Sequence, residues 1–143
     1  MISDQVIRYL YQRSWIQKSI PILILLWTLL ILYLTLFPTD NLLDADIFTY
    51  DKIGHFGMFG GWTGLIGLYF LIYKKDINAP LFAILITGII FGAFIEFLQF
   101  LLPFGRNADF WDVTANTLGC LTAYLILSYL RAKIVKARAG IDP

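Results

Sequence analysis

Four long apolar stretches constrain the fold of this chain more than any other feature. The first reads "SIPILILLWTLLILYLTLF" from Ser19 to Phe37, and the third reads "APLFAILITGIIFGAFIEFLQFLL" from Ala79 to Leu102. A helix needs about 20 apolar residues to cross the hydrocarbon core of a bilayer. Helices satisfy their own backbone hydrogen bonds there, where no water is available. We therefore expect four membrane-spanning helices, over roughly residues 19–37, 54–73, 79–102 and 110–130.

The composition fits a lipid-embedded protein better than a soluble domain. Of the 143 residues, 59% are hydrophobic and 15% are charged, whereas a soluble domain averages about 45–50% apolar and about 25% charged residues. The length fits one domain over residues 1–143. We expect an all-α integral membrane four-helix bundle. The single cysteine, Cys120, leaves no partner for an intrachain disulfide and excludes a cysteine-based metal cluster.

The basic residues predict how the bundle is oriented. Lys52 and Arg106 are the only two of the eleven basic residues in the segments that follow the first and third stretches. Cytoplasmic segments are enriched in Lys and Arg, so both termini should be cytoplasmic and those two segments should face outward. The other basic residues are Arg8, Arg13, Lys18, Lys74, Lys75, Arg131, Lys133, Lys136 and Arg138.

A histidine at the start of the second stretch is the first candidate site residue. The segment "DKIGHF" places Asp51 four residues before His55, the only histidine. Residues four apart share a helix face, so we expect the Asp51 carboxylate to orient the imidazole ring. The alternative is a capping aspartate with an interfacial histidine that meets water.

The third stretch contains an acid where lipid would be expected. Gly88, Gly92, Glu96 and Gln99 lie on one helix face. A carboxylate among apolar side chains is costly, and such groups usually face a protein interior or a water-filled cavity. The alternative is an interhelical hydrogen bond that only holds the bundle together.

The segment "GRNADFWDVTANTLG" continues the pattern at the start of the fourth stretch. Asp109, Asp112, Asn116 and Gly119 are spaced by three, four and three residues, so they share a face if a helix begins near Asp109. Arg106 could bind a carboxylate, or the phosphate or carboxylate of a ligand. Asp109 could instead cap the helix.

The second stretch also carries a row of glycines at helical spacing, Gly57, Gly60, Gly64 and Gly67. Small residues let helix backbones approach closely. We interpret the row as a packing face, and it is also a surface through which copies of the chain could associate.

These motifs together resemble the VanZ-like family of small bacterial membrane proteins. The resemblance covers about Asp51 to Gly119 and rests on "DKIGHF", "EFLQ" and "RNADFWDVTANTLG". It implies a multi-pass protein of the bacterial cytoplasmic membrane. The family takes its name from a member linked to resistance to the glycopeptide teicoplanin. The family's polar residues carry over as Asp51, Lys52, His55, Glu96, Gln99, Arg106, Asp109, Asp112 and Asn116.

Three functions remain open on the sequence alone. The first is an outward-facing site that binds, or acts on, the polar head of an amphiphile. In that hypothesis Lys52 and Arg106 hold an anionic group, His55 is the acid or base, and Glu96 or Asp112 is its partner. The second is a structural protein whose polar residues form an interhelical lock. The third is a small proton or solute transporter that uses Glu96.

The expected partners follow from the same residues. We expect membrane lipids, an amphiphilic envelope ligand or a glycopeptide, and no nucleic acid. The carboxylates and His55 could also hold a divalent cation through oxygen and imidazole ligands, although the sequence does not require one.

Overall fold

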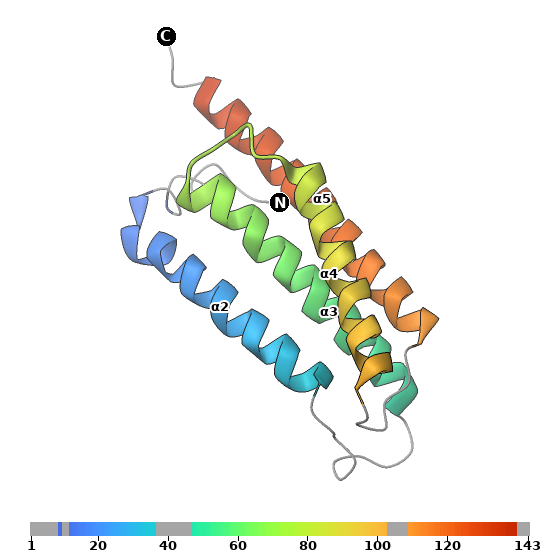
Figure 1. Cartoon of the computed structure of the whole chain (residues 1–143). Coiled ribbons are helices and arrows are strands. Elements are labelled where there is room, and N and C mark those ends of the chain that lie inside the picture. Colours follow the sequence, from blue (N-terminus) through green and yellow to red (C-terminus); the bar gives the residue numbers. More distant parts are fainter. Residues whose placement is uncertain (1–8, 10–11, 37–46, 103–108, 140–143) are drawn as a thin grey trace.

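The computed structural model describes residues 9, 12–36, 47–102 and 109–139, and this part of the chain is helical with no strand (Figure 1). The elements are α2 (Ser14–Leu36), α3 (Ile47–Leu68), the π-helical turn η1 (Tyr69–Tyr73), α4 (Leu81–Leu101) and α5 (Phe110–Ala139). All four α-helices contain a segment long and apolar enough to cross a membrane. The predicted all-α fold with four spans is confirmed.

Three helix boundaries differ from those predicted from apolar content, and one of them is the start of α2, at Ser14 rather than near residue 19. We expected the second helix to begin near residue 54, but α3 begins at Ile47, and α5 continues to Ala139 rather than ending near residue 130. Apolar content marks the part of a helix that lies in lipid, not its ends. Asp51 and Lys52 lie within α3 and form an ion pair there, and Ile134, beyond the predicted end of the fourth helix, is buried in the same apolar cluster as Ile20.

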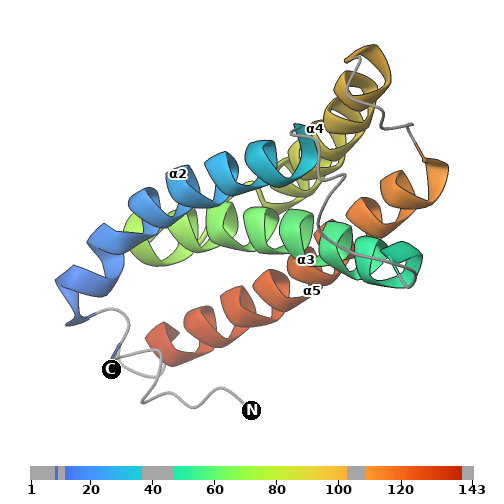
Figure 2. The same cartoon turned by 90° about the horizontal axis from the view of Figure 1, so that it is seen from below.

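Helix α3 lies at the centre of the bundle and contacts α2, α4 and α5. In Figure 2 it lies between α2 and α5. Helices α3 and α5 begin at the same end of the molecule (Figure 1). Helix α4, which connects them in sequence, runs in the opposite direction. The starts of α3 and α5 therefore lie next to the end of α4, and this end of the bundle holds described polar residues singled out above, among them His55, Glu96 and Asp112.

Glycine allows α3 and α5 to touch through their backbones. A Cβ atom on Gly119 would overlap the carbonyl oxygen of Phe56, and a Cβ on Gly60 would lie 2.9 Å from the carbonyl oxygen of Gly119. The predicted packing role thus holds for Gly60 and also for Gly67, where a Cβ would overlap the side chain of Leu127 in α5. It does not hold within the chain for Gly57 and Gly64, where a Cβ would meet nothing within 4 Å.

The buried apolar side chains form two clusters along the bundle axis. One includes Ile20, Leu71 and Ile134, and the other includes Phe59 and Ile95 and reaches the polar end. Many large apolar side chains on the outer surface are exposed, as lipid contact requires.

Candidate functional site

Seven polar side chains gather at the end of the bundle where α3 and α5 begin and α4 ends. We call them the polar cluster, and five of the seven come from within α3 or α5. Their members are Asp51, Lys52 and His55 of α3, Glu96 of α4, Asp109 immediately before α5, and Asp112 and Asn116 of α5.

His55 lies at the centre of the polar cluster, and its side chain is 2% exposed. Its Nδ1 is 3.1 Å from Oδ1 of Asn116, and we assign Nδ1–H as the donor because an amide oxygen is an acceptor. Gly92 makes room for this pair, since a Cβ there would lie 3.0 Å from the Cβ of Asn116. The sequence predicts that Asp51 orients the ring, whereas the hydrogen bond that the ring donates is accepted by Asn116.

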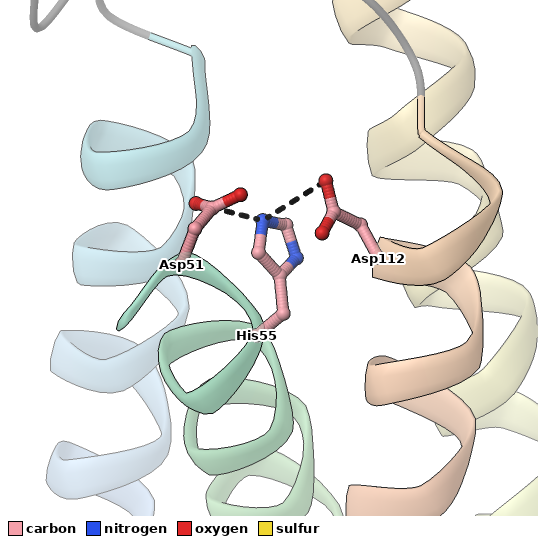
Figure 3. Close-up of side chains that lie close together, drawn as sticks. All are labelled: Asp51, His55 and Asp112. Carbon is pink, nitrogen blue, oxygen red and sulfur yellow. Dashed lines mark ion pairs between the residues drawn. The ribbon is translucent and has the colours of Figure 1, made fainter. Parts of the chain in front are cut away.

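The other ring nitrogen of His55 faces two carboxylates (Figure 3). Its Nε2 is 3.7 Å from Oδ1 of Asp51 and 3.9 Å from Oδ2 of Asp112. Both distances are too long for a hydrogen bond. The three side chains nevertheless converge, since one ligand atom from each lies within 4.8 Å of the other two. Asp51 has 36% of its side chain exposed, so this side of the ring lies toward the surface.

Lys52 neutralises part of this negative charge. Its ammonium donates to Oδ2 of Asp109 at 2.6 Å and to Oδ1 of Asp112, and it lies 3.6 Å from Asp51. The hydrogen bond from Lys52 holds the pKa of Asp109 below its ordinary value. We had assigned the Lys52 ammonium to an anionic ligand group, but it is engaged by carboxylates of the chain itself.

Asp109 has a second role at the start of α5. Its Oδ1 accepts the backbone N–H of Trp111 at 2.9 Å, which is the geometry of a helix N-cap. The capping alternative is therefore confirmed, and the same carboxylate also pairs with Lys52 through its other oxygen. Asp51, by contrast, lies within α3 and is not its cap.

Glu96 is the member of the polar cluster whose hydrogen-bonding capacity is least used among the described residues. The residue is 3% exposed, and neither carboxyl oxygen has a hydrogen-bond partner among the described residues. Its Oε1 is 3.4 Å from Nδ1 of His55, whose N–H is directed at Asn116. The backbone amide of Asp109 is a second neighbouring donor, but it does not complete hydrogen-bond geometry. Nδ2 of Asn116 is likewise buried without a partner.

The cluster therefore combines buried ionisable groups from three helices with unmet hydrogen-bonding capacity. A family model, VanZ/LLP1, matches residues 3–131 of the chain. The chain belongs to the VanZ/LLP1 family. No curated protein and no solved structure matches it significantly.

The VanZ/LLP1 match extends well beyond the motifs that suggested it. The sequence resemblance covered about Asp51 to Gly119, whereas the family model also includes α2 and most of α5. Family membership and the four apolar helices make this chain a multi-pass membrane protein.

Of the predicted site residues that the structure describes, Gln99 alone is not brought into the polar cluster of this VanZ/LLP1 protein. Gln99 is buried on the predicted face of α4, but its Nε2 donates to the carbonyl oxygen of Thr35 at 2.9 Å and so joins α4 to α2. Arg106 lies outside the described residues. The sequence did not single out Thr35, because a threonine in an apolar helix carries no distinctive signal.

Proposed function

We propose that this VanZ/LLP1 protein binds the polar head group of a membrane amphiphile at the polar cluster. We also propose that it lies in the bacterial cytoplasmic membrane with both termini inside. The cluster then faces outward. The basic residues at the end of α5 and in the turn between η1 and α4 support this orientation, since they lie at the opposite end of the bundle.

The observation that carries the proposal is the unsatisfied carboxyl group of Glu96. A cluster that served only to lock helices together would be saturated with hydrogen bonds, because an unmade one costs about 1–3 kcal/mol. Glu96 is buried and has none among the described residues. An unpaired buried polar group needs a specific explanation, such as a functional role or a bound ion, and a bound head group would supply the missing hydrogen-bond partner.

The charges of the polar cluster indicate the class of head group. Among the described residues, four acidic side chains face one ammonium, that of Lys52, and one imidazole. Carboxylates accept hydrogen bonds and donate none when ionised. A ligand that donates hydrogen bonds, such as a sugar hydroxyl or an ammonium group, fits this set better than a bare phosphate. Asp51, at the exposed edge, would meet the ligand first.

A lipid-binding experiment tests the proposal. Purified protein is incubated with short-chain lipids that share one pair of acyl chains and carry a glycosyl, a phosphoethanolamine or a phosphate-only head group. Retained lipid is then counted by native mass spectrometry. We expect the first two lipids to be retained, and we expect Asp51→Asn and Glu96→Gln each to weaken that retention about tenfold, since a hydrogen bond to a charged group contributes about 1.5–3 kcal/mol.

The matched control is Asp76→Asn. Asp76 lies in the turn between η1 and α4, and its Oδ1 accepts the backbone N–H of Asn78, a bond that asparagine can keep. This variant should retain lipid as the wild type does. Wild-type retention by Glu96→Gln and Asp51→Asn would contradict the proposal. Teicoplanin belongs in the same panel, because the link to glycopeptide resistance implied by the family resemblance is part of this proposal.

A further inference from the structure

The surroundings of the His55 ring need a positive species beside Nε2. When Nδ1 carries the proton donated to Asn116, Nε2 of the neutral ring presents a lone pair. That lone pair faces Oδ1 of Asp51 at 3.7 Å and Oδ2 of Asp112 at 3.9 Å. Three acceptors that face one another repel unless a proton or a cation lies between them. Lys52 does not fill this place, because it binds the other oxygen of Asp112.

We propose that Asp51, His55 and Asp112 bind one first-row divalent metal ion. In protein sites the bonds from zinc to nitrogen and oxygen ligands are about 2.0–2.2 Å, so neighbouring ligand atoms are about 3.3–3.6 Å apart in tetrahedral geometry. The two distances to Nε2 exceed this range by a few tenths of an ångström. Side-chain rotation closes such a gap, and the close-up in Figure 3 shows the two carboxylates on the same side of the ring as Nε2.

Glu96 and Asn116 support this assignment from the opposite side of the ring. A histidine that binds a metal usually donates its other N–H to a carboxylate or amide oxygen, which fixes the ring and makes the free nitrogen a better ligand. Nδ1 of His55 faces Oδ1 of Asn116 and Oε1 of Glu96. Glu96 is 3% exposed and its carboxyl oxygens have no hydrogen bond among the described residues. A cation on Nε2 would strengthen the attraction between the ring and this buried acid.

The donor set indicates which ions fit. One imidazole and two carboxylates suit Zn²⁺ and Mn²⁺ better than Ca²⁺, which prefers six to eight oxygens. Three protein ligands leave at least one coordination position open, as in catalytic rather than structural zinc sites. That position would lie beside Asp51 at the exposed edge of the cluster. With the ion bound, His55 is a ligand and not the general acid or base.

Metal titration of the full chain tests this inference without any lipid ligand, so its outcome is independent of the head-group proposal. The protein is purified without a polyhistidine tag in a maltoside detergent, stripped with a chelator, and titrated calorimetrically with Zn²⁺ and with Mn²⁺. We expect one equivalent of at least one of these ions to bind. We expect Asp51→Asn to weaken binding at least about tenfold, because it replaces one of the three proposed ligands, a carboxylate, with a neutral amide.

Asp109→Asn is the comparison variant, because it removes the same charge from the same cluster but no proposed ligand. It should weaken binding by much less than Asp51→Asn does. Size-exclusion profiles would check that both variants are folded, and Asp51, with 36% of its side chain exposed, should tolerate asparagine. Absence of stoichiometric binding by the wild type would overturn the inference. Equal losses in Asp51→Asn and Asp109→Asn would also overturn it, since they indicate general attraction to a negative surface.

Discussion

Gly119→Ala is expected to lower the unfolding midpoint of the purified protein strongly, although it adds one methyl group. A Cβ at this position would overlap the carbonyl oxygen of Phe56, which belongs to the backbone of α3 and cannot rotate away. Helices α3 and α5 would have to separate where they pack most closely. Such overpacking costs about 1–3 kcal/mol. Trp27 reports the change by fluorescence, because its Nε1 donates to the Met58 carbonyl of α3.

Gly64→Ala is the matched control for this prediction. The substitution is identical and Gly64 is also helical, but a Cβ there would meet nothing within 4 Å. Alanine is favoured over glycine within a helix by about 0.5–1 kcal/mol, so this variant should be as stable as the wild type or more so. Similar midpoints for the two variants would show that α3 and α5 are not in backbone contact.

Lys52→Gln is expected to destabilise the protein by about 2 kcal/mol. Breaking a fully buried ion pair costs about 3–5 kcal/mol. We expect a smaller loss in the free energy of unfolding here because 19% of the Lys52 side chain is exposed. The change leaves Asp112 without its cation in a cluster that is already rich in acids. Chemical denaturation measures the loss. Lys136→Gln, at an exposed position on α5, should have little effect.

A second substitution separates loss of the ion pair from simple misfolding. Asp112→Asn in the Lys52→Gln background removes the uncompensated charge, so the double variant should be less destabilised than the sum of the two single variants.

Acid should also lower the stability of the wild type. The pKa of Asp109 is lowered from 3.8 by Lys52, so its contribution to stability is present above pH 3.8 and is lost as the pH falls through the lower, folded value. Lys52→Gln should show a smaller loss over that range. An additive double variant, or an unchanged acid response, would contradict the proposed pairing.

The sequence predicted the four membrane helices and the end of the bundle where the polar residues meet. Both depend on patterns within single helices. Apolar length identifies the spans, and the spacing of Glu96 with Gly88 and Gly92 identifies a buried face. The close backbone contact of α3 with α5 was harder to predict. Gly60 and Gly64 look alike in sequence, and only the position of the neighbouring helix distinguishes them.

The partners of individual side chains could not be predicted, because they depend on how helices are rotated against one another. Asp51 is four residues from His55 and was the natural candidate to orient it. The ring instead donates its hydrogen bond to Asn116, 61 residues away in sequence. Lys52 was expected to bind a ligand, but three neighbouring acids engage it once α5 packs beside α3.

The proposal that the polar cluster binds a ligand is tested most directly by comparing the unfolding midpoint of Glu96→Gln with that of the wild type. Glutamine keeps the shape of the side chain and removes one negative charge from a cluster with excess acid. No hydrogen bond to the carboxyl group is lost among the described residues. Residues held for function rather than stability can often be replaced at no cost, so we predict an unchanged or higher midpoint. A loss of about 3 kcal/mol or more, as expected when a buried pair is broken, would contradict the account and identify the polar cluster as an interhelical lock.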